Sequence, residues 1–344
     1  MDGELWVGLR DDTDAIACEG VEVQVGLARV DSARGALVPA IRGFDAGRFN
    51  VTQLDMRGDR RVVAGFRTEL FAGGSGGGVL LSPPLDLGTS LWPEDVAWED
   101  DRTFWVAGRA SHSPGDPAHV ADTGPRGAAR VVLNEGGAVE SVTLYVRLDR
   151  DSTPGVVTGL PSAEVYDVLV DESGVVHLVC GTERMIGTYD RVEREPFRIA
   201  GELRRGGVAR IEADGSITVI AGPSVVPDGR AGAFAPDGTL YVLDADRGLL
   251  RQTSSGFEGV ELAEVPSGSE PQTLWIGEGG DLVAGYDTGA LVRVGEVSRF
   301  VGDVGVVWSA TPDGDALLLG TDRGLVRVIP EGATDAAEPD PAAG

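Results

Sequence analysis

The chain alternates between short apolar runs, rich in β-branched and aromatic residues, and polar turns. Seven such runs share one form, in which a polar or glycine turn leads into a few apolar residues; they centre near residues 5, 63, 105, 177, 241, 283 and 318. Runs of this length between tight turns predict short β-strands, and their recurrence predicts a repeated unit. The only weak helical candidate, residues 192–203, is interrupted by Pro196.

A second signature follows these runs, a glycine that leads into a strand carrying an arginine. The pattern Gly-x-x-Arg ends at Arg29, Arg130, Arg210, Arg251 and Arg327, and a copy one residue longer runs from Gly289 to Arg293. In the second repeat the pattern begins at Gly78, and Leu81 stands in place of the arginine. Because these arginines recur at equivalent places, we expect them to be structural and to pair with acids on neighbouring strands.

The pattern of each repeat predicts a small antiparallel meander. Turns such as Pro236-Asp237-Gly238 and Pro312-Asp313-Gly314 supply the positive φ that tight hairpins need. Short strands, frequent turns and a period of about 35 to 50 residues are typical of radially repeated sheets. We therefore predict an all-β fold, a β-propeller of about seven four-stranded blades.

Particular segments resemble known propeller repeats. Leu5–Gly8 with Gly26–Asp31, and Gly320 with Gly324–Arg327, resemble the bacterial two-component-regulator type of repeat. Residues 233–242 resemble the related NHL and gluconolactonase-like propellers. The resemblance covers about residues 2 to 330 and implies architecture more than function, since one fold hosts many tasks. We expect a propeller over residues 1–330 and a disordered acidic, Ala/Pro-rich tail over residues 331–344.

The resemblance also implies an irregularity at both ends. In these families a blade runs from the axis outward as strands A, B, C and D. Here the first run matches a B strand with no A strand before it, and the last repeat stops after a C strand. We expect either an unusual ring closure or a chain that is part of a longer protein.

The connections between B and C strands are uneven. Positions 8–26, 65–78, 108–127 and 181–207 bound long connections, whereas 244–248, 285–289 and 320–324 bound minimal hairpins. In the resembling families these connections share one rim, so we expect a lopsided crown on one face of blades 1–4. Long loops on a rigid scaffold commonly carry binding residues, and tolerated variation of surface loops is the alternative.

Candidate binding residues lie in two of these connections. The largest contains aromatic, methionine and arginine side chains, the usual anchors of protein interfaces: Arg184, Met185, Tyr189, Arg191, Arg194 and Phe197. A self-paired, solvated hairpin is the alternative, because acids are interspersed. The connection of blade three adds His112 and His119, whose spacing matches no metal motif. His177, between apolar neighbours, is expected to be packed in a strand.

Composition narrows the function classes. The 344 residues carry 55 acids against 29 bases, all of them arginine, for a formal charge of −26. Such a chain should repel phosphate backbones, so we expect no nucleic-acid partner. No apolar run approaches the ~20 residues of a membrane span and no leader pattern is visible, so we expect a cytoplasmic protein without a membrane partner. Cys18 and Cys180 form no disulfide framework or metal motif, and Cys180 is expected to be buried.

Enzymatic activity is left open but not favoured. The gluconolactonase-like resemblance implies an axial divalent cation held by Glu, Asn and Asp, and the only asparagines, Asn50 and Asn134, do not fill those places. Streptogramin-type lyases imply an axial His with a nearby Glu, and the only strand histidine is His177. No catalytic motif appears. We expect a non-enzymatic interaction scaffold or sensor with a protein partner and no cofactor. A small-molecule ligand, or a metal-dependent lactonase/hydrolase or lyase with an axial cation, is the alternative.

Overall fold

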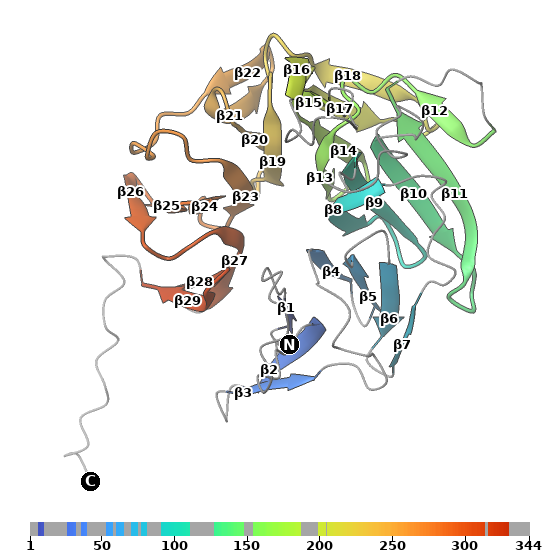
Figure 1. The fold of residues 1–344 in the computed structure, drawn as a ribbon, viewed down its shortest axis with the longest axis horizontal. Coiled ribbons are helices and arrows are strands. Elements are labelled where there is room, and N and C mark those ends of the chain that lie inside the picture. The colour runs from blue at the N-terminus through green and yellow to red at the C-terminus, as the bar shows by residue number, and fades with distance from the viewer. Residues whose placement is uncertain are drawn as a thin grey trace, which may run out of the picture. The chain divides into compact units, whose positions relative to one another are not determined.

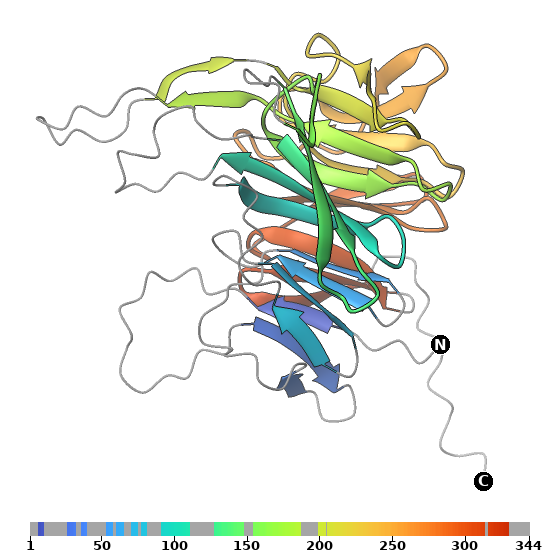
Figure 2. The ribbon, with the colours of Figure 1, turned by 90° about the vertical axis from the view of Figure 1, so that its right-hand side faces the viewer.

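The computed structural model describes residues 6–9, 26–31, 36–39, 53–57, 60–64, 70–74, 77–80, 91–110, 127–147, 154–186, 199–203, 205–313 and 316–329. Side chains are described for Asp55 and for residues 94–108, 127–147, 154–182, 205–312 and 316–329. Across these ranges the chain forms strands and turns (Figures 1 and 2). Within them there is no helix that could cross a bilayer.

The chain divides into two compact units, Met1–Val260 and Glu261–Gly344. The first unit begins with a three-stranded sheet of β1 (Trp6–Leu9), β2 (Gly26–Asp31) and β3 (Ala36–Pro39). A four-stranded sheet follows, made of β4 (Gln53–Arg57), β5 (Arg60–Ala64), β6 (Leu70–Gly74) and β7 (Gly77–Leu80). The third sheet has five strands, β8 (Leu91–Trp98), β9 (Thr103–Ala110), β10 (Gly127–Leu133), β11 (Val139–Val146) and β12 (Val156–Thr158).

Two four-stranded sheets complete the first unit. One contains β13 (Val165–Val170), β14 (Val176–Cys180), β17 (Gly207–Ile211) and β18 (Ile217–Ala221), and the other contains β19 (Gly229–Phe234), β20 (Leu240–Asp244), β21 (Gly248–Thr253) and β22 (Gly256–Gly259). Between β14 and β17 the chain forms a separate hairpin of β15 (Glu183–Ile186) and β16 (Ile199–Leu203). The weak helical candidate was therefore wrong for residues 199–203, because they pair with β15.

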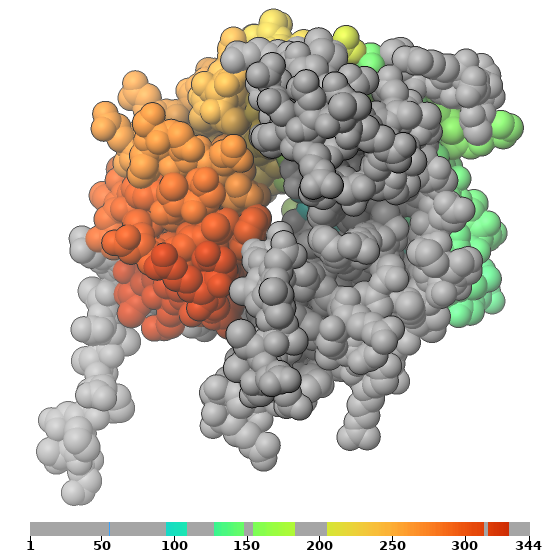
Figure 3. All heavy atoms as spheres, viewed as in Figure 1, coloured from blue at the N-terminus to red at the C-terminus, as the bar shows by residue number. Residues whose placement is uncertain are grey.

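The second unit contains two sheets. One has β23 (Pro271–Ile276), β24 (Leu282–Tyr286), β25 (Gly289–Val294) and β26 (Val297–Gly302), and the other has β27 (Val307–Asp313), β28 (Ala316–Thr321) and β29 (Gly324–Val328). In Figure 3 its described residues, in orange and red, form a continuous surface.

All-β meanders of four antiparallel strands were thus predicted correctly. The seven runs noted in the sequence correspond to β1, β5, β9, β14, β20, β24 and β28. In the described residues the first and last sheets have three strands each. Seven blades and a closed ring remain predictions.

The predicted long connection over residues 65–78 is wrong. The third strand of that sheet is β6, which begins at Leu70, soon after β5 ends at Ala64. The glycine-rich run around Gly74 and Gly77, taken as the entry to the third strand, lies where β6 turns into β7. Long connections therefore separate β1 from β2, β9 from β10 and β14 from β17.

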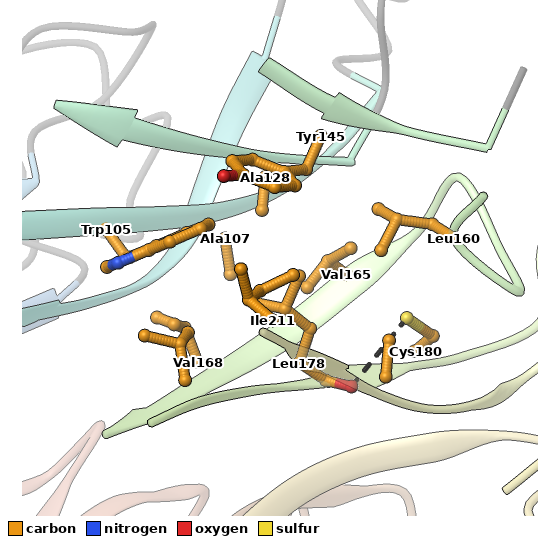
Figure 4. Close-up of a cluster of buried hydrophobic side chains, with 12 residues drawn as sticks. Trp105, Ala107, Ala128, Tyr145, Leu160, Val165, Val168, Leu178, Cys180 and Ile211 are labelled. Atoms are coloured by element: carbon orange, nitrogen blue, oxygen red, sulfur yellow. Dashed lines mark hydrogen bonds between the residues drawn. The ribbon is translucent and has the colours of Figure 1, made fainter. Parts of the chain in front are cut away.

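Both faces of the central sheets are packed. Figure 4 shows one apolar cluster, in which Trp105 and Tyr145 of the third sheet face Val168, Leu178 and Ile211 of the next. The Trp105 and Tyr145 ring centroids are 4.8 Å apart. Every residue of β14 is buried, including Cys180, as the sequence predicted. Packing on both faces explains why four of the five residues of this strand are apolar.

Three of the repeated arginines, Arg130, Arg210 and Arg251, form ion pairs with nearby acids. Arg130 of β10 forms two hydrogen bonds of 2.7 Å to Glu99, through Nε and Nη2. These bonds raise the pKa of Arg130. Arg210 pairs with Glu212, and Arg251 pairs with Glu258 across the β21–β22 hairpin. The predicted role was pairing with acids on neighbouring strands, and Arg251 with Glu258 of β22 confirms it.

Candidate functional site

The first strands of successive sheets share one irregularity, a β-bulge near their beginning. In β8, β13 and β19 the pairing with the second strand shifts by one residue, and the extra residues are Glu94, Tyr166 and Arg230. The second unit has the same shift in β23 and β27, where the extra residues are Gln272 and Trp308. All five are at least partly exposed. A bulge re-aims a side chain, and bulges are common beside functional sites.

The bulges of β8 and β13 lie at the strand ends from which long connections leave. Pro93 of β8 pairs with Gly108 near the end of β9, which leads into residues 111–126. Val165 of β13 pairs with Cys180, the last residue of β14, from which the chain enters the β15–β16 hairpin. The extra residues Glu94 and Tyr166 are therefore close in the fold to the bases of these connections.

Two of the extra residues meet across adjacent sheets. The Arg230 guanidinium carbon lies 4.3 Å from the centroid of the Tyr166 ring. Arg230 Nη2 also donates a 2.8 Å hydrogen bond to Asp228 Oδ2, with the two side chains only 11% and 12% exposed. Asp228 Oδ1 accepts a 2.7 Å hydrogen bond from the Thr182 backbone N–H. We refer to Tyr166, Thr182, Asp228 and Arg230 as the Arg230 cluster.

Buried polar groups and one close approach hold this cluster. Asp244 Oδ2 accepts a hydrogen bond from the Asp228 N–H at 2.8 Å, and burial raises the pKa of Asp244. Gly181 leaves no room for a side chain: a Cβ there would lie 2.5 Å from Tyr166 Cε2 and 2.7 Å from Asp228 Oδ1. The cluster is thus fixed at the first residues of the largest connection.

In β8 and β13 the residue after the bulge is an aspartate, and it has a different, structural role. Asp95 Oδ2 accepts a hydrogen bond from the Val168 N–H at 3.0 Å, and Asp167 Oδ2 accepts one from the Gly232 N–H at 2.6 Å. One sheet earlier, Asp55 Oδ2 accepts from the Trp98 N–H at 2.8 Å. Each carboxylate therefore joins one first strand to the next, and we call Asp55, Asp95 and Asp167 the aspartate ladder. Figure 1 shows β4, β8, β13 and β19 in succession within the first unit.

Two of the residues proposed from the sequence lie in the described part of the chain. Arg184 and Met185 lie on β15, opposite Glu202 and Gly201 of β16, with side chains outside the described part. The other six, His112, His119, Tyr189, Arg191, Arg194 and Phe197, lie outside the described residues. Their role in binding stays a prediction.

Sequence reasoning missed the bulge residues. The available signal was a polar residue directly after a proline or glycine at the start of an apolar run, as in Pro93-Glu94, Gly229-Arg230 and Pro271-Gln272. Proline and glycine inside a strand commonly mark bulges. Tyr166 and Trp308 carry no such signal.

His177 is packed, as the sequence predicted. It is 7% exposed, and its ring centroid lies 5.2 Å from that of Phe234 in an edge-to-face arrangement. Burial lowers the pKa of His177. Over the part of the chain that is described, no three His, Cys, Asp or Glu side chains gather as a metal site would require.

No family model and no curated protein sequence matches the chain. Solved structures do match its fold. The extracellular domain of the two component system BT4673 from B. thetaiotaomicron aligns over 95% of this chain with a TM-score of 0.56 and 13% identity. YCF48 bound to the D1 peptide aligns over 92% of this chain and 88% of its own, with a TM-score of 0.56 and 11% identity. A streptogramin B lyase aligns over 88% and 85%, with a TM-score of 0.55 and 10% identity.

The fold is that of a β-propeller. At 10–13% identity these likenesses show the propeller fold alone. The chain spans 35–40% of the length of the BT4673 domain in two structures of it, and 33% of the extracellular domain of BT3049.

Proposed function

We propose that this propeller is a non-enzymatic interaction or sensing module, which binds a protein partner at the bulged strand ends of its first unit. The long connections β9–β10 and β14–β17 flank the binding surface in this proposal. The observation that carries it is the contrast between two neighbouring positions in the same strands. In β8 and β13 the residue after the bulge is an aspartate in both strands, whereas the bulge residue differs; in β19 the residue after the bulge is Ala231.

The repeated position is structural. In β8 and β13 the residue after the bulge is an aspartate that binds the backbone of the next strand. The bulge position has fixed geometry but changing chemistry, with a carboxylate at Glu94, a phenol at Tyr166 and a guanidinium at Arg230. A repeated scaffold needs no such variety, whereas recognition of an asymmetric partner does.

The Arg230 cluster has the character of an interface anchor. Arginine and tyrosine are enriched among the residues that dominate binding energy. Asp228 and the Tyr166 ring hold Arg230 in one orientation before any partner arrives. Such preorganisation reduces the entropy lost on binding.

Structures with the same fold support an interaction or sensing role in general. YCF48, with the same fold, was solved with a bound peptide, and other neighbours are extracellular domains of one- and two-component systems.

The test shortens the largest connection. Residues 183–204 are replaced by Ala-Asp-Arg, the turn that joins β20 to β21, which leaves Thr182 and the strand ends intact. Proteins recovered with the tagged wild type and the shortened variant from extracts of the source organism are compared by quantitative mass spectrometry. A control variant carries Glu172→Ser in the exposed turn at the opposite end of β13.

We expect a partner that is recovered with the wild type and the control but lost with the shortened variant. Equal recovery with all three proteins, or recovery of no specific protein with any, would refute the proposed function.

A further inference from the structure

The last sheet of the second unit has an outer edge that a further strand could join. Within the described residues, β29 pairs with β28 on one side only. In the other sheet of this unit the third strand, β25, turns after two residues into a fourth strand, β26. Thr321 and Gly324 flank the two-residue turn between β28 and β29, so they form a hydrogen-bonded pair and the pairs alternate from there. The backbone N–H and C=O groups of Leu325 therefore point away from β28, towards the outer edge.

This edge strand also exposes apolar side chains. Leu325 is 43% exposed and Ile329 is 57% exposed, whereas Val328 is buried in the core of the second unit. Because side chains alternate along a strand, Leu325, Arg327 and Ile329 share one face. An edge strand with exposed apolar residues is a place where another strand can add.

The chain that follows β29 has the pattern of a turn and a short strand. Residues 330–344 continue directly from Ile329. Pro330-Glu331-Gly332 suits a three-residue hairpin loop, in which proline takes the first turn position and glycine the left-handed one. The next six residues, 333–338, match residues 324–329 in number, and Pro339 then ends the run.

The register set by this loop matches the side chains of the exposed face. It places Ala333 opposite Ile329, Asp335 opposite Arg327 and Ala337 opposite Leu325. Small apolar residues thus face the two exposed apolar side chains, and an acid faces the arginine between them. The same pairing occurs in the first unit, where Arg251 of β21 lies opposite Glu258 of β22 and forms an ion pair with it. Residues 331–340 contain four acids and no base, so their charge complements this face.

We propose that residues 333–338 dock on β29 as the fourth strand of the last sheet. Docking covers the edge, and a covered edge is no longer open to pairing with other chains. The disorder expected of the tail is then confined to the residues from Pro339 onwards. The inference concerns the second unit alone and does not depend on the proposed function.

The first test uses the unmodified full chain, so that no variant has to fold. Amide hydrogen exchange is followed by NMR at single residues of the tail. In the proposed register the N–H groups of Asp335 and Ala337 face β29, so we expect them to exchange at least about tenfold more slowly than in an unstructured peptide. Exchange at the unstructured-peptide rate at both positions would overturn the proposal, whatever the binding experiments show.

The second test asks whether β29 is the strand that protects the tail. Ala337→Pro removes an N–H group of the proposed ladder, and Ala342→Pro is the matched control beyond the proposed strand. We expect Ala337→Pro to speed exchange of the Asp335 and Leu325 N–H groups by about tenfold or more, and Ala342→Pro to leave both at the wild-type rate. Exchange of the Leu325 N–H group at one rate in all three proteins would overturn docking on β29.

Discussion

The guanidinium group of Arg230 lies over the ring of Tyr166, with its central carbon 4.3 Å from the ring centroid. Both residues are the extra residue of a bulge, in β19 and β13 respectively. The contact therefore joins two sheets through the positions that the repeat leaves free to vary. Asp228, two residues before Arg230 in the chain, accepts a hydrogen bond from the same guanidinium group.

Truncation of Arg230 should destabilise the first unit. Arg230→Ala leaves the nearly buried Asp228 without its ion-pair partner, at an expected cost of about 2 kcal/mol in the free energy of unfolding. Arg230→Lys keeps the charge but loses the planar contact with Tyr166, at an expected cost of about 1 kcal/mol. Urea unfolding measures both values. The exposed Arg247→Ala is the control, and a loss equal to that of Arg230→Ala would contradict this account.

A methyl group at position 181 should displace the cluster. The Cβ of Gly181→Ala would meet Tyr166 Cε2 and Asp228 Oδ1 at distances that real contacts do not reach, so neighbouring atoms must move. We expect a loss of about 1–3 kcal/mol, typical of overpacking. The matched control is Gly222→Ala, where a Cβ meets nothing within 4 Å. Equal melting temperatures for Gly181→Ala and Gly222→Ala would show that the close approach at Gly181 does not affect stability.

Glu99 should contribute more to the free energy of unfolding than an exposed acid does. It accepts two hydrogen bonds from Arg130 and one from Trp105 Nε1 at 2.8 Å. We expect Glu99→Gln to cost about 1–2 kcal/mol, because partly buried, bidentate bonds to charged groups are strong. Glu140→Gln removes an acid that is 55% exposed and pairs with Arg102, and should cost less than about 0.5 kcal/mol. Chemical denaturation measures the loss of unfolding free energy in each variant. Similar losses for Glu99→Gln and Glu140→Gln would contradict the expected difference.

His177 should make the fold sensitive to acid. Burial lowers its pKa below the ordinary 6.5, so the unfolded chain takes up this proton more readily than the folded chain. The stability that neutral His177 contributes is present above 6.5 and is lost as pH falls through the lowered value. His177→Gln should therefore lose less stability than the wild type on acidification, as measured by urea unfolding across that range. A variant that is equally acid-sensitive would exclude His177 as a source.

The sequence was sufficient for the strands because their signals are local. Tight turns such as Asp237-Gly238, and apolar runs such as Val176–Cys180, specify meanders without knowledge of the rest of the chain. The same local reasoning failed where glycines are abundant. Around Gly74 and Gly77 a strand entry and a hairpin turn have the same composition, and the third strand was placed too late.

The candidate site was harder to predict because its signals are not local. Tyr166 and Arg230 are far apart in sequence, and only the packing of β13 against β19 brings them together. A bulge is a mismatch in pairing between two strands, which one strand's sequence does not show. The aspartate ladder likewise depends on the neighbouring strand that supplies each N–H group.

Site-specific photo-crosslinking tests the central claim, that a partner binds at the bulged strand ends of the first unit. A p-benzoylphenylalanine residue is placed singly at positions 94, 166 and 230, and at the exposed positions 172 and 237 in turns at the opposite ends of β13 and β19. We predict that the partner retained by the wild type crosslinks from the three bulge positions and not from the two turn positions. Crosslinks from positions 172 and 237, without any from 94, 166 and 230, would contradict it.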